Sequence, residues 1–353
     1  MTDPGGAVGP SCPVPVEPGA RVQLGHGSGG RLSADLLASV FLAHLDDPEL
    51  GRLADAALLT VADGRLAFTT DAYVVRPPVF PGGDIGSLAV HGTVNDLAMM
   101  GAVPRWMTAA FVLEEGFPLD DLDRLVASMA RAAGEAGVRL VAGDTKVVER
   151  GSADGIFVTT SGVGVVPAGR EVGPERIRPG DQVLLSGPVG THGVAVLAAR
   201  GELDVAVDVV SDSAPLHQLV EAVCAAGDVR ALRDVTRGGL AAVSNELARS
   251  SGVRLVLDEA AVPVLDPVRR VCDVFGLDPL HLAGEGVCLL AVAPDDAEAV
   301  LAAARSLPIG ADAAVVGVAE PPVAGPAPVA LRTRFGTHRP LLVPTTDPLP
   351  RIC

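Results

Sequence analysis

The sequence predicts an α/β (α+β) protein built from two domains. Helical and strand-like apolar patterns alternate along the chain, and its 353 residues exceed the roughly 100 to 200 of one typical domain. The alternation breaks near residues 167–175 and then resumes. We therefore expect domains over 21–168 and 169–335, preceded by a disordered Pro/Gly-rich lead over 1–20 and followed by a mobile tail over 336–353.

Each element of the first domain is predicted from its periodicity and its end signals. Asp84 as N-cap, apolar residues at helical spacing and Gly101 after the last turn predict a helix over 84–100. The other predicted elements are helices over 32–45 and 120–136 and strands over 57–61, 66–70, 138–141 and 156–166.

The second half of the chain has the same kind of alternation. Its predicted elements are helices over 240–250 and 295–306 and strands over 182–185, 253–257, 287–292 and 313–318. The pentapeptide Gly-Val-Arg-Leu-Val occurs at 137–141 and again at 252–256, each time after a helix of small residues. This repeat fits an internal duplication and equally fits chance in a chain of this composition.

Charge and hydropathy exclude several classes of function. The chain carries 27 Lys and Arg against 43 Asp and Glu, a net charge of −16, so it lacks the basic excess that binding a nucleic-acid backbone requires. No apolar run approaches the roughly 18 residues of a membrane span, and no signal peptide is visible, so we expect a cytoplasmic protein. The five cysteines are scattered without a Cys-x-x-Cys pair, which disfavours a zinc or redox site.

A glycine-rich segment, Gly-His-Gly-Ser-Gly-Gly-Arg at 25–31, precedes the first predicted helix. Its spacing matches the dinucleotide fingerprint, but only a stub of strand precedes it, and the acids about 20 residues later close a helix rather than a second strand. Two interpretations remain open. Gly27, Gly29 and Gly30 could lend backbone N–H groups to a phosphate, or the segment could be a plain flexible turn.

Acidic side chains recur at predicted strand ends and in one small-residue helix. They are Asp55, Asp71, the pair Asn95-Asp96, Asp144 and Asp234. Strand ends are where α/β proteins place ligands, and gathered carboxylates need a cation, for which Mg²⁺ on nucleotide phosphates is the usual reason. Any one aspartate alone is more often a turn former or helix cap. Asn95-Asp96 is harder to explain locally, because short polar side chains compete with helical backbone bonding.

Lys146 and Glu285 are candidates for a direct role in chemistry. Lys146, two residues after Asp144, could neutralise a transferring phosphoryl group, or it could be an ordinary surface lysine. Glu285 stands between two glycines ahead of an apolar strand, where it could act as a base or be an unremarkable loop glutamate.

The chain ends in a cysteine, Cys353, after Pro350-Arg351-Ile352. The prolines of 339–353 rule out a helix and favour an extended tail, which at roughly 3.1 Å per residue reaches about 40 Å. Such a tail could present its thiol to one site and insert it into another. The alternative is an incidental terminal cysteine; prenylation is excluded because the cysteine is last rather than fourth from the end.

Six motifs together resemble the HypE family of hydrogenase maturation proteins, in the aminoimidazole ribonucleotide synthetase-like (PurM-like) superfamily. They are the glycine-rich segment at 25–31, Thr-Thr-Asp-Ala-Tyr-Val-Val at 69–75, Val-Asn-Asp-Leu-Ala-Met-Met-Gly at 94–101, Ala-Gly-Asp-Thr-Lys-Val-Val at 142–148, Arg-Asp-Val-Thr-Arg-Gly-Gly-Leu at 233–240 and the final Pro-Arg-Ile-Cys. Several are shared across the superfamily, whereas the ending is typical of HypE. Ser28 stands where a further glycine is common.

The resemblance, which runs from about residue 22 to the last residue, implies a fold, an activity and partners. The fold would be two PurM-like domains, of which the first contributes a ferredoxin-like sheet to a homodimer interface. The activity would be ATP-dependent dehydration of a carbamoyl group on Cys353 to a protein thiocyanate, the source of the cyanide ligand of [NiFe]-hydrogenases. The partners would be the carbamoyltransferase HypF and the HypC–HypD complex.

The resemblance also implies roles for the candidate residues. Mg²⁺ would be held by Asp55, Asp71, Asp96 and Asp234. ATP would contact Gly27, Gly29, Gly30, Asp71, Asn95, Asp96, Asp144 and Lys146. Lys146 would also stabilise the transferring phosphoryl group, Glu285 would be the base, and Cys353 would carry the substrate.

Two rival functions remain. Another ATP-dependent synthetase of the superfamily, of the selenophosphate or aminoimidazole ribonucleotide type, is one. A selenophosphate synthetase would want a reactive cysteine beside the glycine-rich segment, and Cys12 lies too far upstream. The other is a non-catalytic nucleotide-binding scaffold whose tail docks a partner. ATP turnover that depends on Cys353 separates the dehydratase from both.

Overall fold

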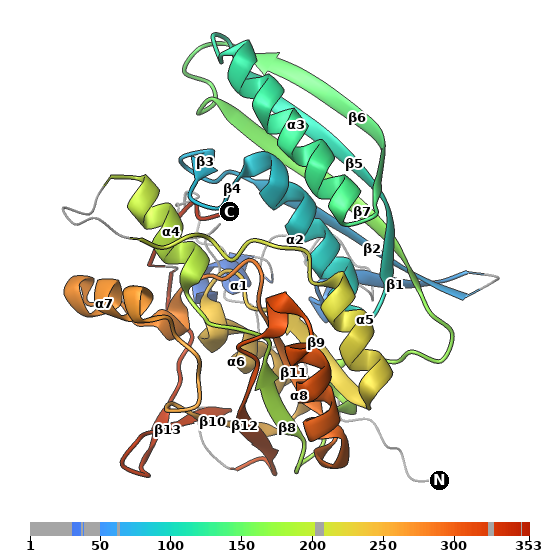
Figure 1. Cartoon of the computed structure of the whole chain (residues 1–353), viewed down its shortest axis with the longest axis vertical. Helices are drawn as coiled ribbons and strands as arrows, with labels where there is room; N and C mark the ends of the chain where they lie inside the picture. The colour runs from blue at the N-terminus through green and yellow to red at the C-terminus, as the bar shows by residue number, and fades with distance from the viewer. Residues whose placement is uncertain are drawn as a thin grey trace.

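The computed structural model describes residues 30–36, 38, 50–61, 64–201, 208–323, 328–346 and 348–353. The described chain forms two α/β domains that meet along helix α2 and the C-terminal residues (Figure 1). The predicted α/β class is therefore confirmed. The lead over 1–20, Gly27, Gly29 and most of the helix predicted over 32–45 lie outside the described residues, and α1 (Gly30–Leu36) is the described part of that helix.

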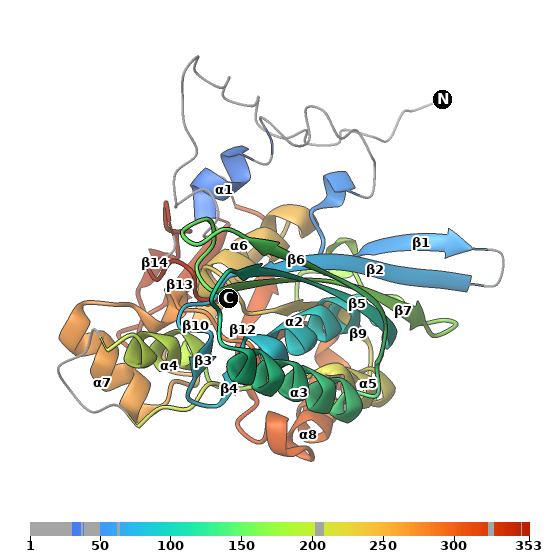
Figure 2. The ribbon, with the colours of Figure 1, turned by 90° about the horizontal axis from the view of Figure 1, so that it is seen from above.

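A five-stranded sheet with two helices on one face forms the N-terminal domain (Figure 2). All neighbouring strands are antiparallel except β5 and β6, which are parallel. In sheet order the strands are β1 (Ala57–Val61), β2 (Gly64–Tyr73), β7 (Ile156–Val166), β5 (Val103–Glu114) and β6 (Arg139–Val148). The covering helices are α2 (Ile85–Met99) and α3 (Leu119–Glu135), and a short ribbon of β3 (Val79–Phe80) and β4 (Gly83–Asp84) leads into α2.

Helix α2 begins where the sequence predicts, at a capping box. The Asp84 carboxylate accepts the backbone N–H groups of Gly86 and Ser87 at 2.8 and 2.9 Å, and the Ser87 hydroxyl accepts the Asp84 N–H at 3.1 Å. Nearly every residue of α2 is buried, because the helix packs against α3 and its own sheet on one side and against β9 and α5 of the second domain on the other. Helix α2 is therefore the structural link between the domains.

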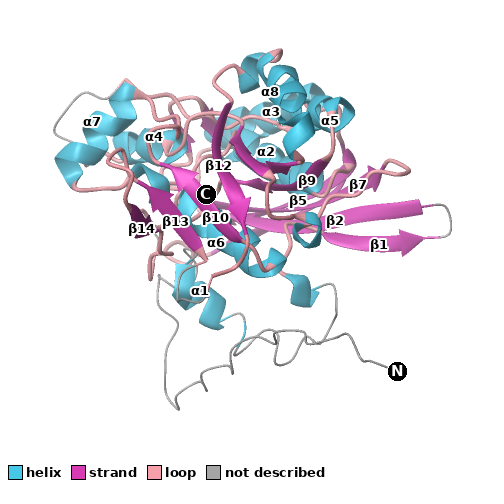
Figure 3. Cartoon of the chain, turned by 90° about the horizontal axis from the view of Figure 1, so that it is seen from below, coloured by secondary structure: helices cyan, strands magenta, loops and turns pink. Residues whose placement is uncertain are grey.

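The C-terminal domain contains a seven-stranded mixed sheet covered by helices (Figure 3). In sheet order its strands are β14 (His338–Pro340), β13 (Val329–Arg332), β10 (Arg254–Asp258), β12 (Ala314–Glu320), β8 (Gln182–Leu185), β11 (Cys288–Val292) and β9 (Val229–Asp234). Its helices are α4 (Thr191–Ala199), α5 (His217–Ala226), α6 (Gly239–Ser251), α7 (Asp266–Phe275) and α8 (Ala297–Arg305), with short 3₁₀ turns between them.

The strand predicted over 138–141 is too short. Strand β6 runs to Val148 because it pairs with β5 along its length, and these main-chain hydrogen bonds hold even the polar Gly-Asp-Thr-Lys stretch in strand conformation. Asp144 and Lys146 therefore lie within an exposed edge strand rather than at a strand end. The sequence analysis also missed three helices, α4, α5 and α7, and six strands, β3, β4, β5, β9, β13 and β14.

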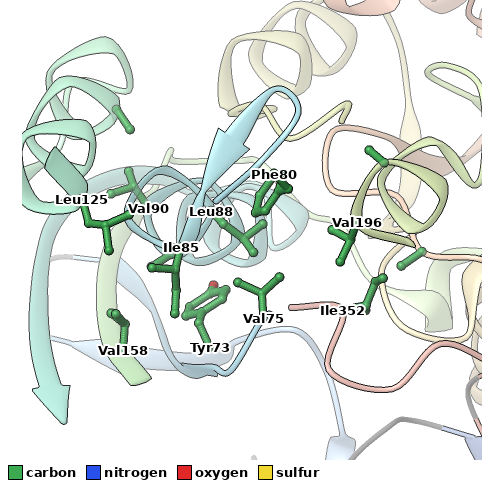
Figure 4. Close-up of a cluster of buried hydrophobic side chains, with 14 of the residues drawn as sticks. Tyr73, Val75, Phe80, Ile85, Leu88, Val90, Leu125, Val158, Val196 and Ile352 are labelled. Atoms are coloured by element: carbon green, nitrogen blue, oxygen red, sulfur yellow. The ribbon is translucent and has the colours of Figure 1, made fainter. Parts of the chain in front are cut away.

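The described part of the C-terminal tail contains no helix, as the prolines predict, but it bends at 345–346 and 348–351 and is docked rather than free. β14 pairs with β13, and three apolar side chains that follow, those of Leu341, Leu349 and Ile352, are 1%, 7% and 2% exposed. Ile352 belongs to the same apolar cluster as Val75 of the first domain and Val196 on α4 of the second (Figure 4). Burial of these side chains fastens the tail between the domains in this structure; its mobility stays a prediction.

Within the described residues, no helix combines the length and the apolar character needed to cross a lipid bilayer.

Removing the cap of α2 should destabilise the N-terminal domain. We expect Asp84→Ala to lower the free energy of unfolding by about 1 kcal/mol, because two helix N–H groups lose their acceptor. Urea unfolding followed by fluorescence of Trp106, the one tryptophan in the sequence, measures this. Asp120→Ala, in the first turn of α3 where no side chain caps the helix, is the control. If Asp84→Ala and Asp120→Ala unfolded at the same urea concentration, the proposed role of the Asp84 cap would be contradicted.

Candidate functional site

Three carboxylates meet where the two domains join. Asp55 precedes β1, Asp96 lies late in α2, and Asp234 ends β9. One carboxylate oxygen from each residue lies within 4.8 Å of the other two. We call these three residues the acidic cluster. Oxygen ligands gathered at this separation suit a hard divalent cation such as Mg²⁺, so the structure brings together three of the four residues predicted to hold metal.

The acidic cluster has an excess of negative charge. Burial is the largest cause that raises the pKa of Asp55 and of Asp96 well above the usual range and that of Asp234 to about 6. Arg233 opposes this shift through an ion pair of 2.9 Å with Asp55. One guanidinium does not balance three neighbouring carboxylates, so a bound cation would stabilise their ionised forms.

Asp71, the fourth predicted metal ligand, lies beside the acidic cluster in β2. Tyr73 donates its phenolic hydrogen to Asp71 Oδ2 at 3.1 Å, and Thr69 donates to Asp96 Oδ2 at 2.7 Å. These bonds orient the two carboxylates. A Cβ at Gly92 of α2 would lie 2.3 Å from the Tyr73 hydroxyl, so glycine is required there for the helix to approach the strand.

The Asn95 side chain is held by the backbone of the second domain. Its amide N–H groups donate to the carbonyls of Ala214 and Glu285 at 3.1 and 3.2 Å, and its carbonyl accepts the N–H of Leu216 at 2.7 Å. The residue is 1% exposed. These contacts explain a polar pair late in an apolar helix: Asn95 fastens α2 to the second domain while Asp96 turns to the acidic cluster. A nucleotide contact by Asn95 stays a prediction.

Glu285 has a buried carboxyl group, one oxygen of which has no hydrogen-bond partner among the described residues. It is 3% exposed, and among the described residues its Oε1 atom has no donor or acceptor within reach. Burial raises its pKa well above the usual range, and the charges of Asp234 and Asp212 add to the effect. A carboxyl group with a high proton affinity in a water-poor site is suited to accept a proton from a substrate.

Asp212 holds the loop that carries Glu285. Its carboxylate accepts the backbone N–H groups of Glu285 and Gly286 at 3.2 and 3.3 Å. A Cβ at Gly286 would lie 1.8 Å from the Asp212 carbonyl oxygen, which explains the glycine after the glutamate. Asp212 is a residue that the sequence analysis missed, because nothing in the motif at 284–286 indicates its partner across the domain.

The docked tail brings Cys353 within electrostatic range of Arg237. The negative charge at Cys353 is the largest cause that raises the pKa of Arg237, and Asp71 and Glu285 contribute further. The Cys353 backbone oxygen itself lies 3.0 Å from the N–H of Val74, three residues after Asp71. Sequence reasoning did not single out Arg237, although it stands in the motif at 233–240, three residues after the strand-end Asp234.

Two predicted site residues lie elsewhere on the subunit. Lys146 Nζ contacts the Asp144 carboxylate at 2.6 Å, both side chains are about two-thirds exposed, and the lysine is the main cause that lowers the pKa of Asp144. Within the described part of the chain, neither forms a hydrogen bond or ion pair with the acidic cluster.

Gly30, which is described, adjoins the tail. Gly30 has a φ of +77°, and a Cβ there would lie 2.5 Å from the Pro344 carbonyl oxygen. The end of the glycine-rich segment is thus packed against the tail that carries Cys353. Whether Gly27 and Gly29 bind phosphate is not addressed by the described residues.

Comparison with known proteins gives consistent results along both domains. Residues 53–166 match the family model of the AIR synthase related protein, N-terminal domain, and residues 178–324 match that of the AIR synthase related protein, C-terminal domain. Carbamoyl dehydratase HypE of Cupriavidus necator is 52% identical over 335 residues, 94% of this chain and 95% of the relative. Carbamoyl dehydratase HypE of Escherichia coli K12 is 45% identical over 338 residues, which cover 94% of this chain and 99% of the relative.

Solved structures agree in fold. Hydrogenase maturation protein HypE in complex with ATP has a TM-score of 0.78 at 48% identity, over 94% of this chain and 99% of that one. A chain of a crystallised HypE-HypF complex has a TM-score of 0.83 at 45% identity, and the match covers 88% of this chain and 99% of that chain.

Divalent-cation binding should depend on Asp96 and on pH. We expect Asp96→Asn to weaken Mg²⁺ affinity at least tenfold at pH 8, because one of three carboxylates is lost. In the parent protein, affinity should rise as pH increases through 6, since Asp234 must lose its proton to bind the cation. Isothermal titration calorimetry at pH 5, 6, 7 and 8 measures both effects.

Asp121→Asn, at an exposed carboxylate on α3 paired with Arg124, is the matched control and should bind Mg²⁺ as the parent does. A pH-independent affinity, or equal affinity in the Asp96→Asn variant, would show that the cation binds elsewhere.

Proposed function

This chain belongs to the HypE family of carbamoyl dehydratases, and on that premise we propose that it dehydrates a carbamoyl group carried on the sulfur of its own Cys353. The reaction converts the S-carbamoyl group and ATP into a thiocyanate, ADP and phosphate. The observation that carries the proposal is the docked tail: Cys353 accepts the N–H of Val74, just after the strand that carries Asp71, and its charge acts on Arg237 together with those of Asp71 and Glu285.

ATP would bind at the acidic cluster. Mg²⁺ would be held by Asp55, Asp96 and Asp234, with Asp71 beside them. The spacing of the carboxylate oxygens in the acidic cluster fits this ion. The bound ion would position the triphosphate and neutralise its charge. Arg237 would offset the negative charge that gathers between Cys353 and Asp71.

Phosphoryl transfer would convert the carbamoyl oxygen into a better leaving group. A carbamoyl oxygen departs poorly, so transfer of the γ-phosphoryl group to that oxygen converts it into a group that leaves as phosphate. The substrate nitrogen loses two protons over the two steps, and the C–O bond breaks as the C≡N bond forms. Glu285 is the proposed acceptor of a nitrogen proton, because its buried Oε1 atom has a high proton affinity and no other partner among the described residues. The docked tail would keep water away from the intermediate.

Lys146 would act in a homodimer. The face of the N-terminal sheet away from α2 and α3 exposes large apolar side chains, among them Phe68, Trp106 and Val165 at 45%, 41% and 37% exposure. We propose that these sheet faces join in a symmetric dimer. The exposed strand that carries Asp144 and Lys146 would then lie at the subunit interface, so that the two residues reach a nucleotide site only in the assembled pair.

The carbamoyl group must come from an enzyme that loads a thiol, and the cyanide must leave to an acceptor. A solved relative was crystallised as a HypE-HypF complex. We propose that HypF carbamoylates Cys353 of this chain and that a HypC–HypD complex receives the cyanide group for [NiFe]-hydrogenase maturation.

Mass spectrometry of the C-terminal peptide tests the reaction. After incubation with HypF, carbamoyl phosphate and ATP, the peptide should first gain about 43 Da and then lose about 18 Da, as carbamoylation followed by dehydration requires. Carbamoylated protein that has been separated from ATP should keep the added mass and should lose the 18 Da only after ATP is supplied again. Cys353→Ser should show no thiocyanate. A peptide that gains the carbamoyl mass and keeps it in the presence of ATP would contradict the proposal.

Replacing the proposed base should arrest the reaction after carbamoylation. We expect Glu285→Gln to accumulate the carbamoyl form and to slow dehydration by about 10² to 10⁴, the usual contribution of a positioned base. Rapid-quench analysis of the peptide measures the rate. Glu221→Gln, at a half-exposed ion pair with Arg170, is the control. A parent-like rate in Glu285→Gln would exclude this residue as the base.

A further inference from the structure

The backbone oxygens of residues 350–353 all accept hydrogen bonds. The backbone N–H groups of Val74 and Arg76, which follow β2, donate to Cys353 O at 3.0 Å and to Arg351 O at 3.2 Å. The residue pairs 74/353 and 76/351 run in opposite directions, and between them the tail turns at Arg351, which has a φ of +55°. Among the described residues, the other donors to the backbone oxygens of residues 350–352 are side chains on α4 and at its C-cap.

Arg200, at the C-cap of α4, contacts the tail twice. Its Nη2 atom donates to Pro350 O at 2.6 Å and to Arg351 O at 2.8 Å, and its Nε atom donates to Arg76 O at 2.9 Å. One guanidinium thus binds the tail and the strand-end segment beside which the tail lies. Arginine suits this role because its planar group presents several donors at once and stays charged.

His192, in the first turn of α4, contacts the tail once. Its Nε2 atom lies 2.8 Å from Ile352 O, and its Nδ1 atom lies 2.8 Å from the Ser211 hydroxyl. Because a carbonyl only accepts, Nε2 carries the proton and Nδ1 accepts from Ser211. Phe80 packs edge-on against the imidazole with ring centroids 5.2 Å apart, which fixes the plane of the ring.

We propose that Arg200 and His192 form a clamp that positions the carrier tail, and that the clamp recognises the main chain of residues 350–352 rather than the group on the sulfur. The inference rests on the proposed function, since it concerns how the carried group reaches the site. Each hydrogen bond that the structure gives these two residues with the described tail residues 348–353 goes to a backbone carbonyl oxygen. Because none of these bonds is made to the Cys353 side chain, the clamp would hold the free, carbamoylated and cyanated forms alike.

Both domains donate hydrogen bonds to the tail. The donors from the first domain are backbone N–H groups of residues 74 and 76, whereas those from α4 are side chains. The Arg351 side chain adds contacts to Val74 O at 3.0 Å and to Asp154 at 2.6 Å. Loss of the Arg200 guanidinium would leave Pro350 O without the one donor that the structure gives it, and unpaired carbonyls favour the solvated tail.

Alkylation of Cys353 measures docking without ATP, HypF or turnover. The protein is treated with iodoacetamide, digested with an endoprotease that cleaves before aspartate, and the peptide of residues 347–353 is quantified by mass spectrometry, which separates Cys353 from the other cysteines. We expect Arg200→Ala to alkylate Cys353 at least fivefold faster than the parent. Arg200→Lys, which keeps the charge but loses the fork of donors, should fall between them.

Arg305→Ala is the matched control, because Arg305 on α8 also donates its Nε–H to a main-chain carbonyl, that of Ala313, at 2.8 Å. Its alkylation rate should equal that of the parent. His192→Gln, which keeps an N–H donor, should alkylate more slowly than His192→Phe, and circular dichroism and Mg²⁺ titration verify that each variant is folded. Equal Cys353 rates in Arg200→Ala, Arg305→Ala and the parent would overturn the clamp.

Single-turnover dehydration of the carbamoylated protein gives the second readout. Arg200→Ala should react more slowly in proportion to its loss of docking, with the ATP concentration for half-maximal rate unchanged. A dehydration rate equal to that of the parent in a variant with an exposed Cys353 would overturn the positioning role. If the parent formed no thiocyanate while Arg200→Ala still exposed Cys353, the proposed function would fail and the clamp would stand.

Discussion

The structure depends on carboxylates buried together where the two domains meet. Asp55, Asp96 and Asp234 share one small region, and Glu285 lies near enough to Asp234 for its pKa to rise further. Few cations oppose this charge, chiefly Arg233 and Arg237. Without a ligand, this arrangement lowers the free energy of unfolding, because buried carboxyl groups lose their hydration. It becomes favourable when a cation and a substrate complete it, which is typical of a reactive site.

The same junction explains why the tail docks there. Helix α2 contributes Asp96 to the acidic cluster and uses Asn95 to hold the second domain, so the distance between the domains is fixed at the site. The tail enters the remaining space, buries Ile352 and has the backbone oxygens of residues 350–353 hydrogen-bonded. Recognition through the main chain leaves the terminal sulfur to vary in its chemical state.

Much of this was predictable from the sequence, and the failures have physical reasons. The capping box of α2 and the grouping of Asp55, Asp96 and Asp234 follow from local signals and from the rule that strand ends meet. Strand β5 was missed, and β6 was cut short, because pairing with neighbours far along the chain outweighs their weak local preference. Arg200, His192 and Asp212 carry no local signal, since their partners lie some 70 to 160 residues away along the chain.

The central claim is that the final sulfur of the chain is the cargo on which the nucleotide acts. A crystal structure of the S-carbamoylated protein with Mn²⁺ and a non-hydrolysable ATP analogue tests it most directly. The account predicts anomalous density among Asp55, Asp96 and Asp234 and a carbamoyl oxygen about 3 to 3.5 Å from the γ-phosphorus, a near-attack distance. A nucleotide bound elsewhere, or a docked Cys353 whose sulfur has no path to the γ-phosphate within the subunit or across the dimer, would contradict it.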